Sequence, residues 1–286
     1  MTYSIVGRDE ASGELGVAVQ SRAFGVGICA WARPGVGAVA TQSFTEKRYG
    51  PAGLDLLAAG AAPADALAEL LAADEQRDFR QVAILSADGR TAAHTGAACV
   101  PDCGHVSRDG MSAQGNMLAS PAVWHAAADT FETTAGTLAE RLLAALDAAE
   151  DAGGDFRGRE AAALVVVSGD PHEEPWEHVF DLRVDNHAQP LNELRRLHRI
   201  AATYRRRRDF DASSSLDEEV ARAREAGLPE DQVAVTAALV AGAHGDVGEA
   251  AARLRPVAES DQRWREAFER YVRLGFMPLA VLDRLS

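Results

Sequence analysis

The fold is decided by the stretch MTYSIVGRDEASGELGVAVQSRAFGVG, residues 1–27. Residues 3–6 alternate polar and apolar side chains, residues 9–13 carry turn-forming residues, and residues 15–19 resume an extended pattern. This pattern predicts a β-hairpin whose first strand starts at Thr2. Met1 is generally removed when the second residue is small, so we expect this strand to open on a free N-terminal threonine.

A free threonine at the terminus combines a hydroxyl nucleophile with an α-amine in one residue. The reference pKa of such an amine is about 7.7–8.0, so the amine can act as the base for the hydroxyl. Thr2 is therefore the candidate nucleophile of an acyl-transfer site. The alternative is a threonine that starts the strand and has no chemical role, and retention of Met1 would exclude the amine as base.

The arrangement resembles the N-terminal-nucleophile (Ntn) hydrolases, in which a Gly-x-x-x-x-Ser-Arg-like segment, here residues 16–22, follows the first strand. A longer match resembles a bacterial family, domain-of-unknown-function family 1028, over about residues 1–207. Its fold is described as Ntn-hydrolase-like, and it carries no agreed reaction. The segments that carry the match are TYSIV at 2–6, GELGVAV at 13–19, SR at 21–22, WAR at 31–33, GVGAVATQ at 35–42, RYG at 48–50, QGNML at 114–118 and GGDFRG at 153–158.

The rest of the chain predicts an α+β protein in two parts. Residues 1–208 read as strands, two helices, strands, two helices, strands and a helix, with residues 25–31 as the third strand. This order fits a four-layer αββα sandwich, the architecture that the family resemblance also implies. Residues 209–215 read as a linker, and residues 216–286 read as about four helices. Part of this helical region resembles a tetratricopeptide-type helix pair. We expect the helical region to serve in dimerisation or docking.

An acyl-transfer site at Thr2 also needs oxyanion donors and groups that position the substrate. The Ntn pattern places Ser21 and Arg22 beside the nucleophile, and Asn116 closes a predicted strand with an amide donor. Each of these residues also has a purely structural interpretation, as a strand-end or loop side chain. The further candidates for binding substrate are Gln42, Ser43, Arg48, Tyr49, Gln114, Gly115, Asp155 and Arg157. The charged turn that contains Asp155 and Arg157 has a salt-bridge cluster as its alternative.

The bulk composition excludes several classes of partner. The formal net charge is −14 and the pI is about 5.0, which disfavours nucleic acid and anionic membranes. The arginine run at 205–208 is the exception, and we interpret it as a helix end whose cations pair with acidic neighbours. No apolar run is long enough for a membrane span, and no export signal is recognised, so a cytoplasmic protein is expected. A homodimer is expected by analogy with similar sandwiches.

Three cysteines do not make a disulfide framework. The alternative of a zinc site at His94, Cys99, Cys103 and His105 lacks the usual short Cys-x-x-Cys spacing, and we expect neither a metal nor a cofactor. The leading hypothesis is therefore an Ntn-type hydrolase that cleaves an amide or related C–N bond of a small metabolite. The competing hypothesis is a non-catalytic ligand-binding or scaffold protein on the same fold.

Overall fold

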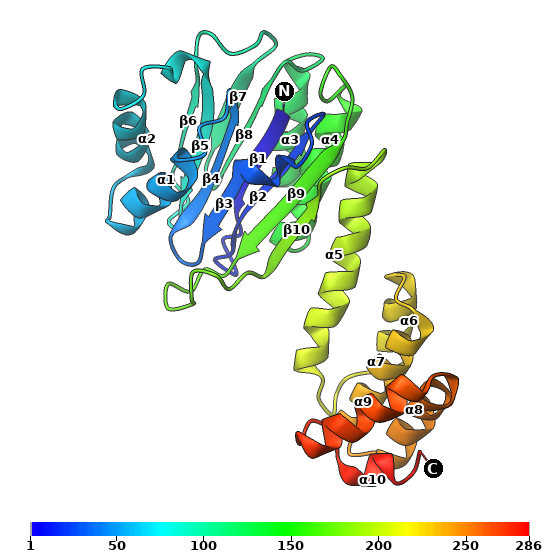
Figure 1. The fold of residues 1–286 in the computed structure, drawn as a ribbon. Helices are drawn as coiled ribbons and strands as arrows, with labels where there is room; N and C mark the ends of the chain where they lie inside the picture. The colour runs from blue at the N-terminus through cyan, green and yellow to red at the C-terminus, as the bar shows by residue number, and fades with distance from the viewer. Residues whose placement is uncertain (1, 286) are drawn as a thin grey trace. The chain divides into compact units, whose positions relative to one another are not determined.

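The computed structural model describes residues 2–285, and the chain divides into two compact units, Met1–Arg195 and Arg196–Ser286. All the strands of the described chain belong to the first unit, and the second is helical (Figure 1). The mixed α/β character and the helical C-terminal part predicted from the sequence are confirmed.

The first unit contains two antiparallel sheets. The larger has the strand order β10 (Phe180–Val184), β9 (Ala161–Val167), β2 (Leu15–Ser21), β1 (Thr2–Arg8), β8 (Met111–Asn116) and β7 (Gly104–Arg108). The smaller has the order β3 (Ala30–Arg33), β4 (Gly37–Ser43), β5 (Arg80–Ser86) and β6 (Thr91–Thr95). The predicted hairpin at the start of the chain is thus β1–β2, at the centre of the larger sheet.

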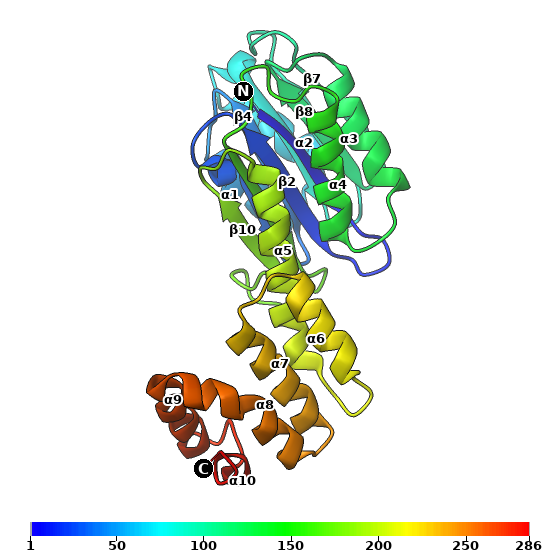
Figure 2. The same ribbon diagram turned by 90° about the vertical axis from the view of Figure 1, so that its right-hand side faces the viewer.

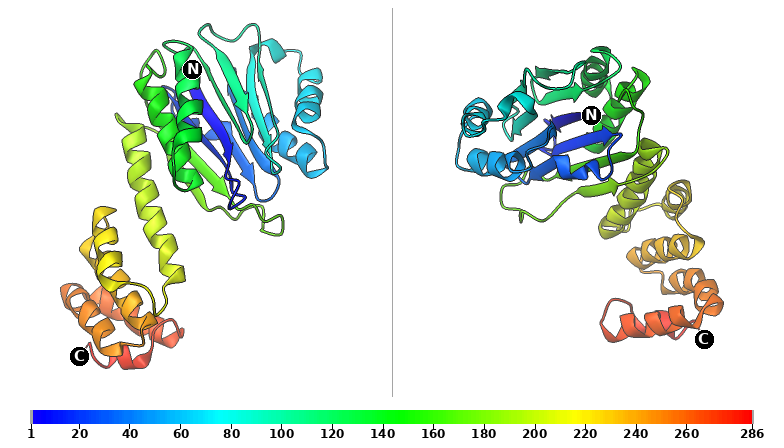
Figure 3. Two further views of the ribbon diagram at one scale, coloured as in Figure 1. Left: turned by 180° about the vertical axis from the view of Figure 1, so that it is seen from behind. Right: turned by 45° about the horizontal axis from the view of Figure 1, so that its top comes forward.

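Helices cover the outer face of each sheet. On the smaller sheet lie α1 (Tyr49–Ala58) and α2 (Pro63–Ala72), and on the larger lie α3 (Ala122–Thr133) and α4 (Leu138–Asp151). Figure 3 shows the two sheets facing each other with these helix pairs on opposite outer sides. A capping box at Thr137 and Glu140 starts α4, because each side chain accepts a backbone N–H of the other residue.

The space between the sheets differs from one end to the other. Side chains alternate along each strand, so every second residue of β1, β2, β4, β5 and β8 faces the opposite sheet. Toward the end of β1 these residues are apolar, and they form a core that includes Val6, Leu15, Val17, Ala38 and Leu85. At the end where β1 begins, the inward-facing residues are buried and polar.

The predicted third strand at residues 25–31 is wrong in its first half. Residues Val26–Cys29 form a short 3-10 helix, η1, and the strand begins only at Ala30. Gly25 has a φ of 66°, in the left-handed region, which turns the chain away from an extended path. The two glycines at 25 and 27 also give the segment little strand propensity.

The helical unit comprises the latter part of α5 (Pro190–Arg206), η3 (Arg207–Asp209), α6 (Leu216–Glu225), α7 (Glu230–Ala243), α8 (Val247–Ser260), α9 (Gln262–Arg273) and α10 (Leu279–Leu282). A further 3-10 helix, η2 (Arg77–Phe79), lies in the first unit. In Figure 2 the helices α6, α7 and α8 follow one another, and α7 packs against both of its neighbours. Their core includes Ala251, Leu254 and Phe268. None of the helices among residues 2–285 has the length and apolar character needed to cross a bilayer.

Candidate functional site

The polar end of the sandwich brings Thr2 together with several residues predicted from the sequence. Thr2 pairs with Ser21 of β2 on one side and with Asn116 of β8 on the other. Since residues opposite each other in an antiparallel pair share a face, all three side chains point toward the smaller sheet. Gln42, on β4 of that sheet, completes the group.

The hydroxyl of Thr2 is buried and has a defined partner. Thr2 Oγ1 donates to Ser21 Oγ at 3.1 Å, and Ser21 Oγ also accepts the backbone N–H of Ala23 at 3.1 Å. Gln42 Nε2 donates to the carbonyl oxygen of Thr2 at 3.1 Å. Thr2 is 5% exposed and Ser21 fully buried, so the start of β1 is held from both sheets. Met1, whose removal the nucleophile hypothesis requires, lies outside the described residues.

A residue that the sequence analysis did not single out, Gln81, connects the two sheets. Its Oε1 accepts from Gln42 Nε2 at 2.8 Å and from Asn116 Nδ2 at 2.9 Å. Its Nε2 lies 2.8 Å from the carbonyl oxygen of Gly115 and 2.9 Å from Thr95 Oγ1. The only local sequence signal for Gln81 is a glutamine at the start of a strand-like run. The residues that it bonds to in the other sheet are distant from it in sequence.

The neighbouring inward-facing residues extend this network along β1. Ser4 Oγ donates to Gln42 Oε1 at 2.8 Å, and Gln114 Nε2 lies 3.3 Å from Ser4 Oγ and 3.2 Å from the carbonyl oxygen of Ala40. Asn116 Oδ1 and Gln114 Oε1 are buried and have no hydrogen-bond partner among residues 2–285. The polar end therefore presents two unused acceptors. Gly115 lies between them, and a Cβ there would come within 2.2 Å of Leu118.

The charged candidates Arg22, Asp155 and Arg157 form ion pairs in the loops at the end of β2 and before β9. The Arg22 guanidinium forms an ion pair with Glu160, and only its backbone N–H, donated to Asp155 Oδ2 at 2.9 Å, turns toward the sandwich. The Asp155 side chain is buried and also accepts the backbone N–H of Arg157 at 2.9 Å. Arg157 pairs with Asp155 at 3.3 Å. These contacts fix the turn beside the end of β2.

The candidates Ser43, Arg48 and Tyr49 lie at the end of β4 and at the start of α1, and among the described residues none of them is hydrogen-bonded to Thr2. Ser43 has a φ of 69°, and its buried Oγ has no partner within the described chain. Tyr49 is buried and donates to Asp74 Oδ2 at 2.9 Å; burial and this carboxylate raise the pKa of Tyr49 well above its ordinary value. Arg48 is exposed and lines a pocket of about 410 Å³ together with Lys47 and Arg183.

Three of the four candidates for zinc ligands have hydrogen-bond partners other than a metal. His94 Nε2 lies 3.0 Å from the carbonyl oxygen of Arg77, and His105 Nδ1 lies 2.9 Å from Thr95 Oγ1. Cys99 Sγ donates to the carbonyl oxygen of Arg80. Within residues 2–285 no three His, Cys, Asp or Glu side chains are grouped as a metal site.

Comparison with known proteins supports the resemblance read from the hairpin and the later motifs. Residues 2–194 match the family model DUF1028, described as a family of unknown function. The chain belongs to the DUF1028 family. The crystal structure of a DUF1028 protein from Silicibacter pomeroyi is 32% identical and superposes with a TM-score of 0.62, covering 69% of this chain and 87% of that one. A search of curated proteins gave no match. The family match covers the sandwich unit and ends where the helical unit begins.

Proposed function

We propose that the sandwich unit is an Ntn-type hydrolase that cleaves an amide or related C–N bond of a small metabolite. Thr2 is the nucleophile, once Met1 has been removed, and its own α-amine is the base. The observation that carries the proposal is the hydrogen bond from the Thr2 hydroxyl to Ser21, in a polar cluster that also contains Asn116 and Gln42. The helix–sheet–sheet–helix layering agrees with the Ntn-hydrolase-like architecture.

The chemistry follows from the two groups on Thr2. The α-amine accepts the hydroxyl proton while Oγ1 forms a bond to the substrate carbonyl carbon. The ammonium then returns the proton to the leaving nitrogen as the C–N bond breaks, which leaves an ester on Thr2. Water, deprotonated by the same amine, hydrolyses that ester and regenerates the hydroxyl.

The surrounding amides have distinct tasks in this scheme. Ser21 holds the Thr2 side chain at the start of β1, and Gln42 fixes the Thr2 carbonyl. The hydroxyl proton, which points to Ser21 Oγ, turns to the α-amine before the attack. Asn116 Nδ2 gives one N–H to Gln81 and has a second for the oxyanion, while the unused acceptors Asn116 Oδ1 and Gln114 Oε1 suit a substrate N–H or hydroxyl.

The burial of Thr2 favours a second candidate function. A side chain that is 5% exposed and hydrogen-bonded within the sandwich is also what a non-catalytic ligand-binding or scaffold protein would show. The two functions differ in one property, the presence of a reactive hydroxyl next to a free amine.

The test treats the purified full chain with a β-lactone, which acylates a reactive hydroxyl, and measures intact mass. The proposal expects a mass that lacks Met1 and a single adduct that peptide mapping assigns to Thr2. Thr2→Ala should abolish the adduct, and Thr2→Ser should retain it; both keep a small second residue. Thr41→Ala is the matched control, because Thr41 is a buried threonine whose Oγ1 has no partner within the described residues. Quantitative retention of Met1, or equal labelling of Thr2→Ala, would refute the hydrolase and leave the binding protein.

A further inference from the structure

The helical unit contains an apolar pocket that no part of the proposed chemistry uses. Its volume is about 580 Å³, and α7, α8, α9 and the segment before α10 supply its wall. Leu254, Trp264 and Phe268 line its interior, while Leu239 and Phe276 are 45% and 78% exposed. Sites for small molecules have volumes of about 300–1,000 Å³ and mostly apolar walls.

One cation, Arg207, lines this pocket and has no carboxylate partner within the described chain. Its guanidinium donates to Thr236 Oγ1 at 2.8 Å from Nη2, to the Gln232 carbonyl oxygen at 2.8 Å and to Gln232 Oε1 at 3.2 Å. Nε donates to Thr236 Oγ1 as well, so the partners of this guanidinium within the described residues are neutral groups. Burial lowers the pKa of Arg207, and its guanidinium lies 4.2 Å from the centre of the Tyr204 ring.

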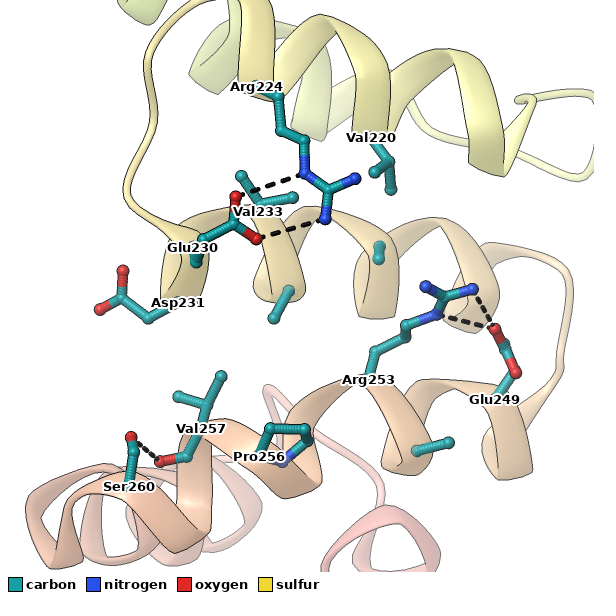
Figure 4. A pocket seen from close by; sticks show the side chains of 13 residues that line it. Val220, Arg224, Glu230, Asp231, Val233, Glu249, Arg253, Pro256, Val257 and Ser260 are labelled. Atoms are coloured by element: carbon teal, nitrogen blue, oxygen red, sulfur yellow. Dashed lines mark hydrogen bonds and ion pairs between the residues drawn. The ribbon is translucent and has the colours of Figure 1, made fainter.

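The arginines of the neighbouring pocket in the same unit have carboxylate partners. That pocket, of about 670 Å³, contains two arginines, and each has a glutamate in the same wall (Figure 4). Arg224 pairs with Glu230 at 3.2 Å, and Arg253 pairs with Glu249 at 2.7 Å. Arg207 is half-buried beside a hydrocarbon wall and has no carboxylate partner within the described residues, so its charge is available to an anionic ligand.

We propose that this pocket binds a free aliphatic monocarboxylate, with the carboxylate on Arg207 and the alkyl chain along the apolar wall. A single unpaired cation matches a single negative charge. A peptide is less suited, because each residue of an extended chain brings an N–H and a C=O that need partners. The polar side chains of the wall are few, chiefly Arg207, Gln232 and Tyr271.

The test measures binding of octanoate, decanoate and 1-octanol to the full chain by isothermal titration calorimetry. Octanoate should bind about 10-fold or more tightly than 1-octanol, because a hydrogen bond to a charged group adds to the shared alkyl burial. Decanoate should bind about 10-fold more tightly than octanoate, because two more methylenes are buried. Equal affinity of octanoate and 1-octanol would overturn the proposal.

Variants separate the pocket from unspecific binding. Arg207→Gln should weaken octanoate about 10-fold or more and leave 1-octanol unchanged, whereas Arg207→Lys should keep part of the preference. The matched control is Arg208→Gln, which removes an exposed cation one residue away. The same loss in Arg208→Gln, or binding through Arg207 of a peptide ending in leucine but not of octanoate, would refute the proposal.

Arg207 also holds Gln232 and Thr236, so its replacement can affect folding, which circular dichroism would show. A second variant, Leu239→Glu, places a negative charge at an exposed position of the rim and disturbs no core contact. It should weaken octanoate at least 10-fold and 1-octanol much less. Unchanged affinity for octanoate in a folded Leu239→Glu protein would refute the proposal independently.

Discussion

Replacement of Gln81 by leucine should destabilise the sandwich unit severely, although the two side chains are similar in size. Gln81 Oε1 accepts hydrogen bonds from Gln42 Nε2 and Asn116 Nδ2, which belong to different sheets. All three residues are fully buried, so water cannot replace the lost acceptor. The substitution therefore leaves two buried N–H donors without an acceptor.

The magnitude follows from the number of donors that are left. An unsatisfied buried donor costs about 1–3 kcal/mol, so two of them lower the free energy of unfolding by about 2–6 kcal/mol. For a unit of this size each kcal/mol lowers the melting temperature by about 2–4 °C. Gln81→Leu should therefore lower the melting temperature of the sandwich unit by roughly 5–20 °C.

The control is Gln20→Leu, which makes the same chemical change at an equally buried position. Neither Oε1 nor Nε2 of Gln20 has a partner among residues 2–285, so this substitution removes no hydrogen bond within that part of the chain. Its free energy of unfolding should stay within about 1 kcal/mol of the parent or rise. Thermal and urea unfolding, followed by circular dichroism and tryptophan fluorescence, compare the two variants. Equal destabilisation by both would refute the assignment of the network.

Two further predictions concern the Asp74–Arg80 pair and two helical glycines. The hydrogen bond from Arg80 is the main cause that lowers the pKa of Asp74 to about 2. The stabilisation that this pair gives the folded protein is therefore complete above about pH 4 and is lost as the pH falls toward 2. Asp74→Asn should lower the free energy of unfolding by about 2 kcal/mol at pH 7, and urea unfolding at several pH values should show a weaker loss of stability in acid. Gly50→Ala should destabilise the protein by more than about 1 kcal/mol, because the new Cβ would lie 2.2 Å from the Trp31 ring. Gly242→Ala should stabilise α7 by about 0.5–1 kcal/mol, because a Cβ there has no atom within 4 Å. A thermal melt in which Gly242→Ala is the less stable of the two variants would contradict this packing.

Patterns that are local in sequence predicted most of the elements. The hairpin at the start of the chain and the helical character of the C-terminal part are confirmed. Alternation and turn chemistry act over a few residues, so they survive in a single sequence. The 3-10 helix at Val26–Cys29 was missed because its apolar residues are those of a strand, and only Gly25 in the left-handed region shows the difference.

The candidate site was predictable only where it follows from the hairpin. Thr2 and Ser21 occupy the two ends of β1–β2, so a correct hairpin brings them together. Gln81 could not be found in this way, because its role arises from the packing of one sheet on the other. The four arginines at 205–208 show a similar limit: Arg206 has the expected acidic partner, Glu219, whereas Arg207 bonds only to neutral groups.

The contrast between the two ends of the sandwich is itself an argument for a site. At one end Val6 and Val17 fill the space between the sheets, which shows that apolar packing is available to this fold. At the other end the chain buries amides and leaves Asn116 Oδ1 and Gln114 Oε1 without donors from the described residues, at a cost of about 1–3 kcal/mol for each. A ligand that donates to these two acceptors would offset that cost, and it would lie beside the hydroxyl of Thr2, because Asn116 is the direct strand partner of Thr2.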